Sequence, residues 1–312
     1  MRAALLGTYL GLIWLVLAAS AFGQSQTLPF TAWTVDDGLS QATVTSITQD
    51  TTGYVWLGTD DGLNRFDGVD FTVFRHDDAD STSLPHSSIE DLLVHPDGTL
   101  WVATYGGGIA RFDPQRQVFR SYLPDTTLEA LRVITLHPAP DGAVWLGTEG
   151  AGLFHFDPIT ETFTPYRHDP ADPSTLRSDV IRDVVTTPDG ALWIGTYGGG
   201  LSRLDPATGD VSSWAVDDLT PWHSHNRVHT LTTDRAGSLW LGTPTGIVHL
   251  TRPGAAPDTV TTRAVFASGD AVPDGTIQDV LIDADDRLWA TIEGGGLVCY
   301  DAADDRFRSV EP

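Results

Sequence analysis

The segment PWHSHNRVH, residues 221–229, contains the densest group of side chains that could bind a metal ion or another ligand. Imidazole nitrogens are common metal ligands, and a His-x-His sequence places two of them close together. No third ligand follows at a spacing typical of a metal site, so solvated histidines are the favoured interpretation and we predict no metal site. As ligand-binding candidates the segment offers Trp222, His223, His225, Asn226 and His229.

A second group of candidates lies in six short glycine-rich segments. Tyr105 and Tyr197 could stack on a sugar ring or another flat group. Asp60, Glu149 and Glu293 could accept hydrogen bonds from hydroxyl groups. The alternative is that the glycines only make turns while their neighbours face solvent. The segments are Asp60–Gly62, Tyr105–Gly108, Glu149–Gly152, Tyr197–Gly200, Pro244–Gly246 and Glu293–Gly296.

Other patterns that carry chemistry are weak or missing. The acidic runs HDDAD at 76–80 and HDPAD at 168–172 could bind Ca²⁺ through carboxylates, but they lack the spacing of a calcium loop. The sequence has no G-x-S-x-G, no H-E-x-x-H and no P-loop motif. Aspartate is so frequent that no pair of carboxylates stands out as catalytic. We therefore predict neither catalytic residues nor a cofactor in this chain.

The glycine-rich segments belong to an internal repeat. Residues 190–205 read GALWIGTYGGGLSRLD, and five related sequences occur, the last of them more divergent. A regular period of this length indicates an array of supersecondary units that bury their apolar faces against one another. The repeated tryptophans are 44 to 49 residues apart, at Trp56, Trp101, Trp145, Trp193, Trp240 and Trp289.

Residues 173–219 indicate how one repeat folds. VIRDVVTT, ALWIGT, LSRLD and DVSSWAV are short strand-forming stretches, and turn sequences such as TPDG and DPATGD separate them. Frequent glycine and proline residues exclude a helical repeat. Four hairpin-linked strands at this period predict an all-β fold, a β-propeller built from four-stranded antiparallel blades.

In such a propeller the tryptophans are expected to pack between neighbouring blades. The residue two positions after each tryptophan is small in five repeats and would let a neighbouring backbone or the ring itself approach closely: Gly58, Ala103, Gly147, Gly195 and Gly242. Any pocket is expected on the face formed by the loops between second and third strands and between blades. Six blades are predicted, at about residues 38–80, 81–125, 126–172, 173–219, 220–266 and 267–312.

The sequence FTAWTV, residues 30–35, is similar to the last strand of a further blade. Propellers usually close by pairing strands from both ends of the chain, which removes exposed sheet edges. We therefore expect the six blades to be part of a seven-bladed ring, in a truncated chain whose remaining strands would follow Pro312. A closed six-bladed ring with one spare strand is the alternative.

The net charge limits the partners. The chain has 312 residues, of which 42 are acidic and 18 basic, and its formal net charge is −24. Such a surface repels nucleic acids and anionic lipids, so we expect no nucleic-acid partner. A solvated, salt-tolerant surface typical of a halophilic organism is the favoured explanation, and a cation-binding role is the alternative.

The N-terminus predicts export. Residues 1–23 combine Arg2, an apolar stretch and the small residues Ala21 and Gly23, which is typical of a secretory signal peptide. An uncleaved membrane anchor is the alternative. Residues 24–312 would then form the propeller in the periplasm or outside the cell. The only cysteine, Cys299, falls in a predicted strand, so no internal disulfide supports the fold.

Two stretches resemble a known family. They are DGLSQATVTSITQDTTGYVWLGTDDGLNRFDG at 37–68 and HDPADPSTLRSDVIRDVVTTPDGALWIGTYGGGLSRLDP at 168–206. Both are similar to the two-component regulator propeller, the periplasmic sensor region of hybrid two-component systems, and residues 76–108 show the same order of acidic linker and strands. The resemblance covers the chain after the signal peptide. It weakens in the last two repeats, where RPGAAPDTVTT is an unusual turn and Ile292 replaces a threonine.

The resemblance implies a non-catalytic propeller that recognises a periplasmic or extracellular ligand, for which an oligosaccharide is a candidate. Signalling to a histidine kinase or a diguanylate cyclase would use rearrangement of a homodimer. Membrane attachment would come only from a missing C-terminal region or from an uncleaved N-terminal segment. A stand-alone secreted propeller that binds carbohydrate or protein is one alternative, and a propeller lyase or hydrolase is a weaker one.

Overall fold

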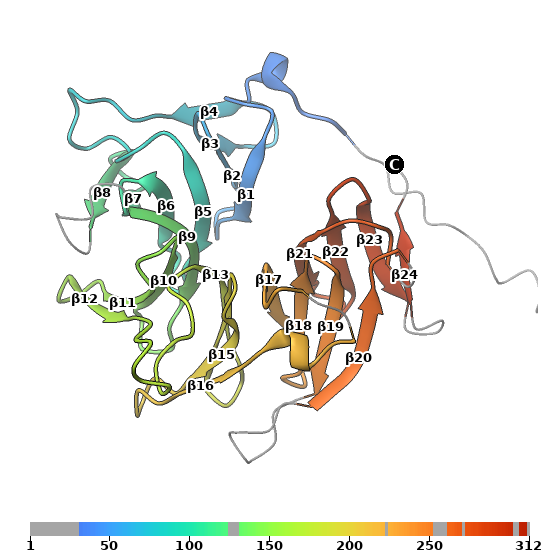
Figure 1. Cartoon of the computed structure of the whole chain (residues 1–312). Coiled ribbons are helices and arrows are strands. Elements are labelled where there is room, and N and C mark those ends of the chain that lie inside the picture. Colours follow the sequence, from blue (N-terminus) through green and yellow to red (C-terminus); the bar gives the residue numbers. More distant parts are fainter. Residues whose placement is uncertain are drawn as a thin grey trace, which may run out of the picture.

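The computed structural model describes residues 31–123, 131–221, 224–251, 261–269, 272–301 and 306–310. The expected signal peptide, residues 1–23, lies outside the described residues. In the described part, the strands form six antiparallel units of four strands, the blades, which are arranged around a common axis (Figure 1). The predicted all-β propeller architecture is confirmed.

The strands of each blade follow one another from the axis outwards, in sequence order (Figure 1). Blades 1 and 2 consist of β1 (Val44–Gln49), β2 (Val55–Thr59), β3 (Gly62–Phe66), β4 (Phe71–Phe74), β5 (Ile89–Val94), β6 (Leu100–Gly106), β7 (Ile109–Asp113) and β8 (Val118–Tyr122). Blades 3 and 4 consist of β9 (Leu131–Pro138), β10 (Val144–Thr148), β11 (Leu153–Asp157), β12 (Thr162–Tyr166), β13 (Ile181–Thr186), β14 (Leu192–Thr196), β15 (Gly200–Leu204) and β16 (Val211–Trp214). Blades 5 and 6 consist of β17 (Thr230–Thr233), β18 (Leu239–Thr243), β19 (Gly246–Thr251), β20 (Thr261–Ala267), β21 (Ile277–Ile282), β22 (Leu288–Ile292), β23 (Gly296–Asp301) and β24 (Arg306–Ser309).

The strands predicted within residues 173–219 agree with β13 to β16 to within two residues at each end. Cys299 lies in β23, as predicted for a strand residue. Blades 2 and 3 are additionally joined because β6 pairs with β9, where Tyr105 lies opposite Arg132. This extra pairing brings a candidate ligand residue of one blade directly to the innermost strand of the next.

Successive blades pack through a buried tryptophan and a glycine two positions later, which both adjoin a β-branched side chain of the next blade. Trp193 of β14 is fully buried and shares a hydrophobic cluster with Val228, at the entry to blade 5. Gly195 follows two positions later, and a Cβ there would lie 2.7 Å from Val228 Cγ1. The tryptophan is thus between blades, as predicted, but the group that approaches the glycine is a β-branched side chain of the next blade instead of backbone or the indole ring. Gly58 with Ile89, Gly147 with Ile181 and Gly242 with Ile277 repeat the contact.

Three aspartates on alternate inner strands form a second link between blades. Asp91 of β5 accepts hydrogen bonds from Ser46 Oγ of blade 1 (3.0 Å) and from the backbone N–H of Leu136 of blade 3 (2.7 Å). Asp183 of β13 accepts one from the backbone N–H of Leu231 of blade 5 (2.6 Å). Asp279 of β21 accepts one from Thr230 Oγ1 of blade 5 (2.9 Å). We call Asp91, Asp183 and Asp279 the aspartate belt.

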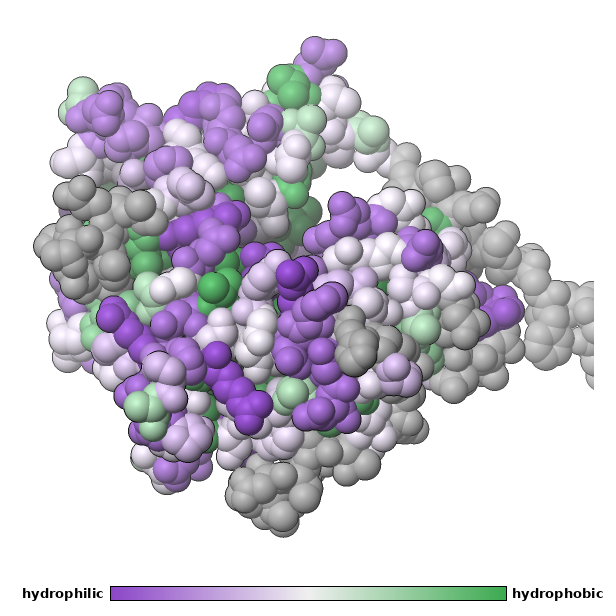
Figure 2. All heavy atoms as spheres, viewed as in Figure 1, coloured by the Kyte–Doolittle hydropathy of each residue, from purple (hydrophilic) through white to green (hydrophobic). Residues whose placement is uncertain are grey.

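The ring is open between blades 6 and 1. Innermost strands contact each other in turn from β1 to β21, and Figures 1 and 2 show an opening between blade 6 and blade 1. Ile47 of β1 is 65% exposed, whereas its counterparts in the other blades are buried. Those counterparts are Leu92, Leu136, Val184, Leu231 and Val280.

The prediction of an extra strand at residues 30–35 is wrong for residues 31–35, which the structure describes and which form no strand. Val35–Asp37 form a short 3₁₀ helix, capped by Thr34, whose hydroxyl accepts a hydrogen bond from the Asp36 backbone N–H. Trp33 packs on the rings of Phe66 and Phe71 at 4.7 and 6.1 Å between ring centres. The capping residues outweigh the strand preference of the preceding aromatic residues, because a Thr-x-x-Asp sequence satisfies the free N–H groups of a helical turn.

We expect Gly195→Ala to lower the free energy of unfolding by about 1–3 kcal/mol, because the added methyl group overlaps Val228. Urea-induced unfolding measures this loss. In a Val228→Ala background most of the overlap is gone, so the same substitution should cost less. An equal loss in both backgrounds would contradict the proposed contact.

The aspartate belt predicts a pH dependence of stability. Burial raises the pKa of Asp91 to about 6 and that of Asp183 to about 7, against the opposing effect of the backbone N–H donors. The unfolded-state pKa is near 3.8, so the stabilisation is complete below about pH 4 and is lost as the pH rises through 6 to 7.

We therefore expect Asp183→Asn to be most destabilising at pH 5 and to cost about 1–3 kcal/mol less at pH 8, where the wild type carries a buried charge. Unfolding free energies of both proteins at several pH values test this. Asp80→Asn, in an exposed loop, serves as the control. A difference between wild type and Asp183→Asn that does not vary with pH would refute the assignment.

Candidate ligand-binding site

The glycine-rich segments form the turns between the second and third strands of each blade. A threonine lies at or near the end of the second strand in blades 1 to 5. Its hydroxyl donates to the carbonyl of a glycine at or just before the start of the third strand, as from Thr148 Oγ1 to Gly152 (2.7 Å). The backbone N–H of the next residue, Glu149, donates to the carbonyl of Arg132 on the innermost strand (3.0 Å). The residue after the threonine is thereby held beside the axis. We call these positions the rim: Asp60, Tyr105, Glu149, Tyr197, Pro244 and Glu293.

Between blades 2 and 3 the rim is organised by Arg132. Its guanidinium donates to Glu90 (2.8 and 3.0 Å) and to Glu149 (2.7 Å), and lies 5.4 Å from the centre of the Tyr105 ring. The hydrogen bonds to Glu90 hold the pKa of Arg132 above its usual value, so this charge is fixed. Tyr105 is 49% exposed. One ring face is thus covered by an arginine of the next blade, while much of the ring remains accessible to a ligand.

Between blades 4 and 5 the rim repeats this arrangement with different partners. The guanidinium of Arg227 lies 4.3 Å from the centre of the Tyr197 ring, and Tyr197 is 42% exposed. Arg182, near the start of β13, and His229, just before β17, are half-buried. Burial, and next the charge of Arg182, lower the pKa of His229. This side of the rim is therefore cationic through its arginines.

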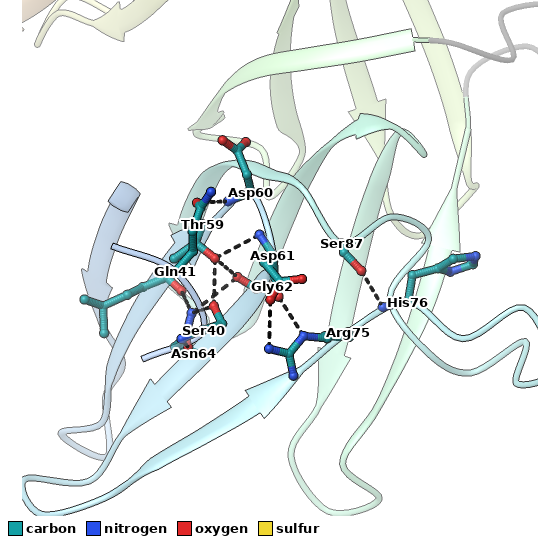
Figure 3. Close-up of polar contacts among 11 residues, drawn as sticks. Ser40, Gln41, Thr59, Asp60, Asp61, Gly62, Asn64, Arg75, His76 and Ser87 are labelled. Atoms are coloured by element: carbon teal, nitrogen blue, oxygen red, sulfur yellow. Dashed lines mark hydrogen bonds and ion pairs between the residues drawn. The ribbon is translucent and has the colours of Figure 1, made fainter. Parts of the chain in front are cut away.

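In blade 1 the carboxylate of Asp60 points away from the cluster around Thr59 and Asn64 (Figure 3). Its Oδ1 accepts a hydrogen bond from Ser88 Oγ of blade 2 (2.9 Å). Glu293 of blade 6 accepts one from Gln278 Nε2 (3.3 Å). All five rim residues named as candidates therefore occupy equivalent places around the axis. Asp60, Tyr105 and Tyr197 touch the next blade with their side chains, and Glu149 does so through a backbone bridge to Val180.

The histidine-rich segment does not join the rim as a unit. His225 is exposed and adopts a left-handed conformation with φ 56° in a turn. Asn226, also left-handed, accepts a hydrogen bond from the backbone N–H of Asp217 (3.2 Å) and so has a structural role. Among the described candidates of this segment, only His229 adjoins an innermost strand, directly before β17. Trp222 and His223 lie outside the described residues.

The acidic runs stabilise their own loops. In HDDAD, Asp80 accepts hydrogen bonds from the backbone N–H and hydroxyl of Thr82, and the ring of His76 bonds the carbonyl of Leu84 (2.6 Å). In HDPAD, the ring of His168 bonds the carbonyl of Leu176 at the same distance. Among the described residues, no three His, Cys, Asp or Glu side chains converge to hold a metal ion.

Two grooves lie at the ends of the strands opposite to the rim. A groove of about 690 Å³ between blades 1 and 2 is lined by turns that join first to second and third to fourth strands, and by Tyr54, Arg65 and Arg111. A second groove of about 360 Å³ lies between blades 3 and 4, beside Trp145 and Arg203. The expectation that any pocket lies on the face of the rim is therefore wrong for these two grooves.

Sequence reasoning missed the charged partners of the rim, which are Glu90, Arg132, Arg182 and Arg227. Each lies near the start of an innermost strand, 27 to 33 residues along the chain from the nearest rim residue of another blade. An available signal was their place in the repeat, because the residues that begin each innermost strand vary between copies while the buried positions do not.

Comparison with known proteins agrees with this architecture. Three segments, residues 38–61, 83–106 and 175–198, match the family described as the two component regulator propeller, so the chain contains repeats of this family. Asp60, Tyr105 and Tyr197 of the rim fall at the same place in the three matched segments. A stretch of 79 residues is 42% identical to histidine kinase P4 of Formosa agariphila, over 25% of this chain and 6% of that protein.

Solved structures share the fold. The extracellular domain of the hybrid two component system BT3049 from B. thetaiotaomicron has a TM-score of 0.72 and 24% identity, over 90% of this chain and 36% of that chain. The virginiamycin B lyase of Staphylococcus aureus has a TM-score of 0.64 and 16% identity, over 85% and 83% of the two chains. The chain thus spans about a third of the sensor domain that it resembles. No helix among the described residues is long and apolar enough to cross a membrane.

The two carboxylates that bind Arg132 should contribute differently to the free energy of unfolding. Glu90 is 11% exposed and Glu149 43% exposed at the side chain. We expect Glu90→Gln to lower the free energy of unfolding by about 1–3 kcal/mol and Glu149→Gln by less than about 0.5 kcal/mol, because solvent screens the outer pair. Chemical unfolding of the two variants in parallel measures this, and equal losses would show that burial does not set the strength of this cluster.

Proposed function

We propose that this chain is the ligand-binding propeller of an extracytoplasmic sensor in a two-component signalling protein, and that oligosaccharides or similar small molecules bind at the rim. The observation that carries the proposal is the pair of exposed tyrosines, Tyr105 and Tyr197, which flank Glu149 around the axis. Exposed aromatic rings beside carboxylates suit sugars, because the ring stacks on the apolar face of a sugar while the carboxylate accepts from its hydroxyls.

Two further observations support a sensing role. The repeats belong to a family described by its regulator function, and a similar solved structure is the extracellular domain of a hybrid two component system. The rim residues also contact the next blade, through Asp60 with Ser88, Tyr105 with Arg132 and Tyr197 with Arg227. A ligand on the rim therefore alters contacts between blades without any covalent chemistry.

The proposal extends to the cellular context. The propeller would lie in the periplasm or outside the cell after export, with the remainder of the signalling protein supplied by regions that this sequence does not contain. Ligand binding would be transmitted by a change in the arrangement of two copies of the full-length protein, since a ligand shifts an equilibrium when it binds one arrangement more tightly.

Binding to an oligosaccharide panel tests the proposal. The panel should hold neutral, carboxylated and sulfated members, and hits should be titrated by isothermal calorimetry. We expect Tyr105→Ala or Tyr197→Ala to weaken binding of a hit by about tenfold, from the loss of about 1–1.5 kcal/mol of stacking.

Tyr54→Ala is the matched control, because Tyr54 is exposed and also lies under an arginine, Arg65 at 4.8 Å, but borders the groove at the opposite end of the strands. An equal loss of affinity in this variant would place the ligand away from the rim. Absence of binding to every panel member would reject saccharide recognition.

A further inference from the structure

The rim sector between blades 4 and 5 contains guanidinium groups without carboxylate partners. The Nε atom of Arg182 is buried and has no hydrogen-bond partner among the described residues. Within the described part of the chain, neither Arg182 nor Arg227 forms an ion pair with a carboxylate, whereas Arg132 of the neighbouring sector binds two. We call Arg182, Arg227, His229 and Tyr197 the cationic sector.

The buried donor of Arg182 distinguishes this sector from the other arginines. Among the described arginines, only Arg182 has a buried guanidinium nitrogen without a hydrogen-bond partner, whereas Arg75, Arg120 and Arg203 each pair with a carboxylate. A buried guanidinium donor without an acceptor is costly, because it has lost water and gained nothing in exchange. The sector is therefore arranged as if its acceptor comes from outside the chain.

The groups of the cationic sector meet where blades 4 and 5 adjoin. The backbone N–H of Tyr197 donates to the carbonyl of Val180 (3.0 Å), two residues before Arg182, and Tyr197 forms a backbone bridge with Arg227. The half-buried His229 lies two residues after Arg227, and burial together with the charges of both arginines lowers its pKa. Arg227 covers one face of the Tyr197 ring at 4.3 Å. The acidic neighbour on this side is Glu293, which accepts a hydrogen bond from Gln278. The sector thus joins fixed positive charge to an exposed aromatic ring.

We propose that the cationic sector binds an oxyanion group of the ligand, a carboxylate or a sulfate carried by an acidic saccharide. Arg182 and Arg227 donate hydrogen bonds to the oxyanion, since the planar guanidinium matches a carboxylate or sulfate with paired donors. The adjoining sugar ring rests on the free part of Tyr197. This inference rests on the proposed function, because it assigns the chemical class of the ligand that the rim recognises.

Calorimetric titration of matched saccharides tests the assignment. The probes are a uronic-acid tetrasaccharide, the same compound with its carboxyl groups reduced to alcohols, and a sulfated tetrasaccharide. We expect the two acidic probes to bind at least tenfold more tightly than the reduced one, and the tighter of the two identifies the oxyanion. Arg182→Gln and Arg227→Gln should each remove most of this preference.

Two control variants separate charge from folding. Arg120→Gln removes an exposed arginine of β8 that pairs with Glu161, and should leave the affinities unchanged. Arg182→Lys keeps the charge but not the planar fork, and should recover only part of the affinity. If Arg182→Gln also changes the unfolding midpoint, Arg227→Gln, whose side chain lies on the surface of Tyr197, still tests the sector.

A second measurement decides the inference independently of saccharides. Titration of sodium sulfate, and in a second arm sodium acetate, at constant ionic strength is followed by the arginine Nε–H signals in an NMR spectrum. A saturable shift in the wild type that Arg182→Gln abolishes supports the oxyanion site. Equal binding of neutral and acidic saccharides that depends on Tyr197 would overturn this inference and leave the proposed function intact. No saccharide binding together with no saturable shift would overturn both.

Discussion

The contact between a buried tryptophan of one blade and a β-branched side chain of the next is the constraint on which the rest of the structure depends. A single four-stranded sheet has two apolar faces and can bury neither alone, so each blade is stable only between neighbours. Glycine at the point of closest approach, as at Gly147 and Gly195, sets how near two blades come. Once the blades are packed at this distance, the rim residues at the ends of the second strands come into contact with the next blade, as Asp60 does with Ser88 and Tyr105 with Arg132.

The aspartate belt, on the innermost strands, also depends on the presence of neighbouring blades. Asp91 and Asp183 each have a blade on both sides and accept hydrogen bonds from both, whereas Asp279 has only blade 5 beside it and is exposed. Burial of a carboxylate is unfavourable unless donors surround it, so these groups favour a defined order of blades more than they add stability.

Blade 6 also departs from the repeat in its second strand. An exposed threonine, Thr291, stands where the other blades have glycine or alanine, and Ile292 stands where they have the threonine that closes the turn. Both differences lie where no further blade packs in the described structure.

Much of the fold could be predicted from the sequence because its determinants are local and repeated. The 44- to 49-residue spacing, the turn residues and the alternation of strand stretches define a blade without any long-range information. The rim positions were predictable for the same reason, since each follows a recognisable second strand. Their partners were not, because Arg132 and Arg227 reach Tyr105 and Tyr197 only after two blades are packed at a particular distance. The 3₁₀ turn at Val35–Asp37 was not predicted, because the aromatic residues before it favour a strand whereas its capping residues favour a helical turn.

The fold by itself does not decide between sensing and catalysis, since a lyase and a sensor domain share it at similar TM-scores. The connections of the rim bear on the proposed sensing role. Its polar groups are shared between blades, as Arg132 is shared by Glu90 of blade 2 and Glu149 of blade 3. A ligand that displaces one of these partners would change the energy of an inter-blade contact, and neighbouring blades are linked through their inner strands. In the proposed sensor, binding at the rim would thus be converted into a change of packing between blades.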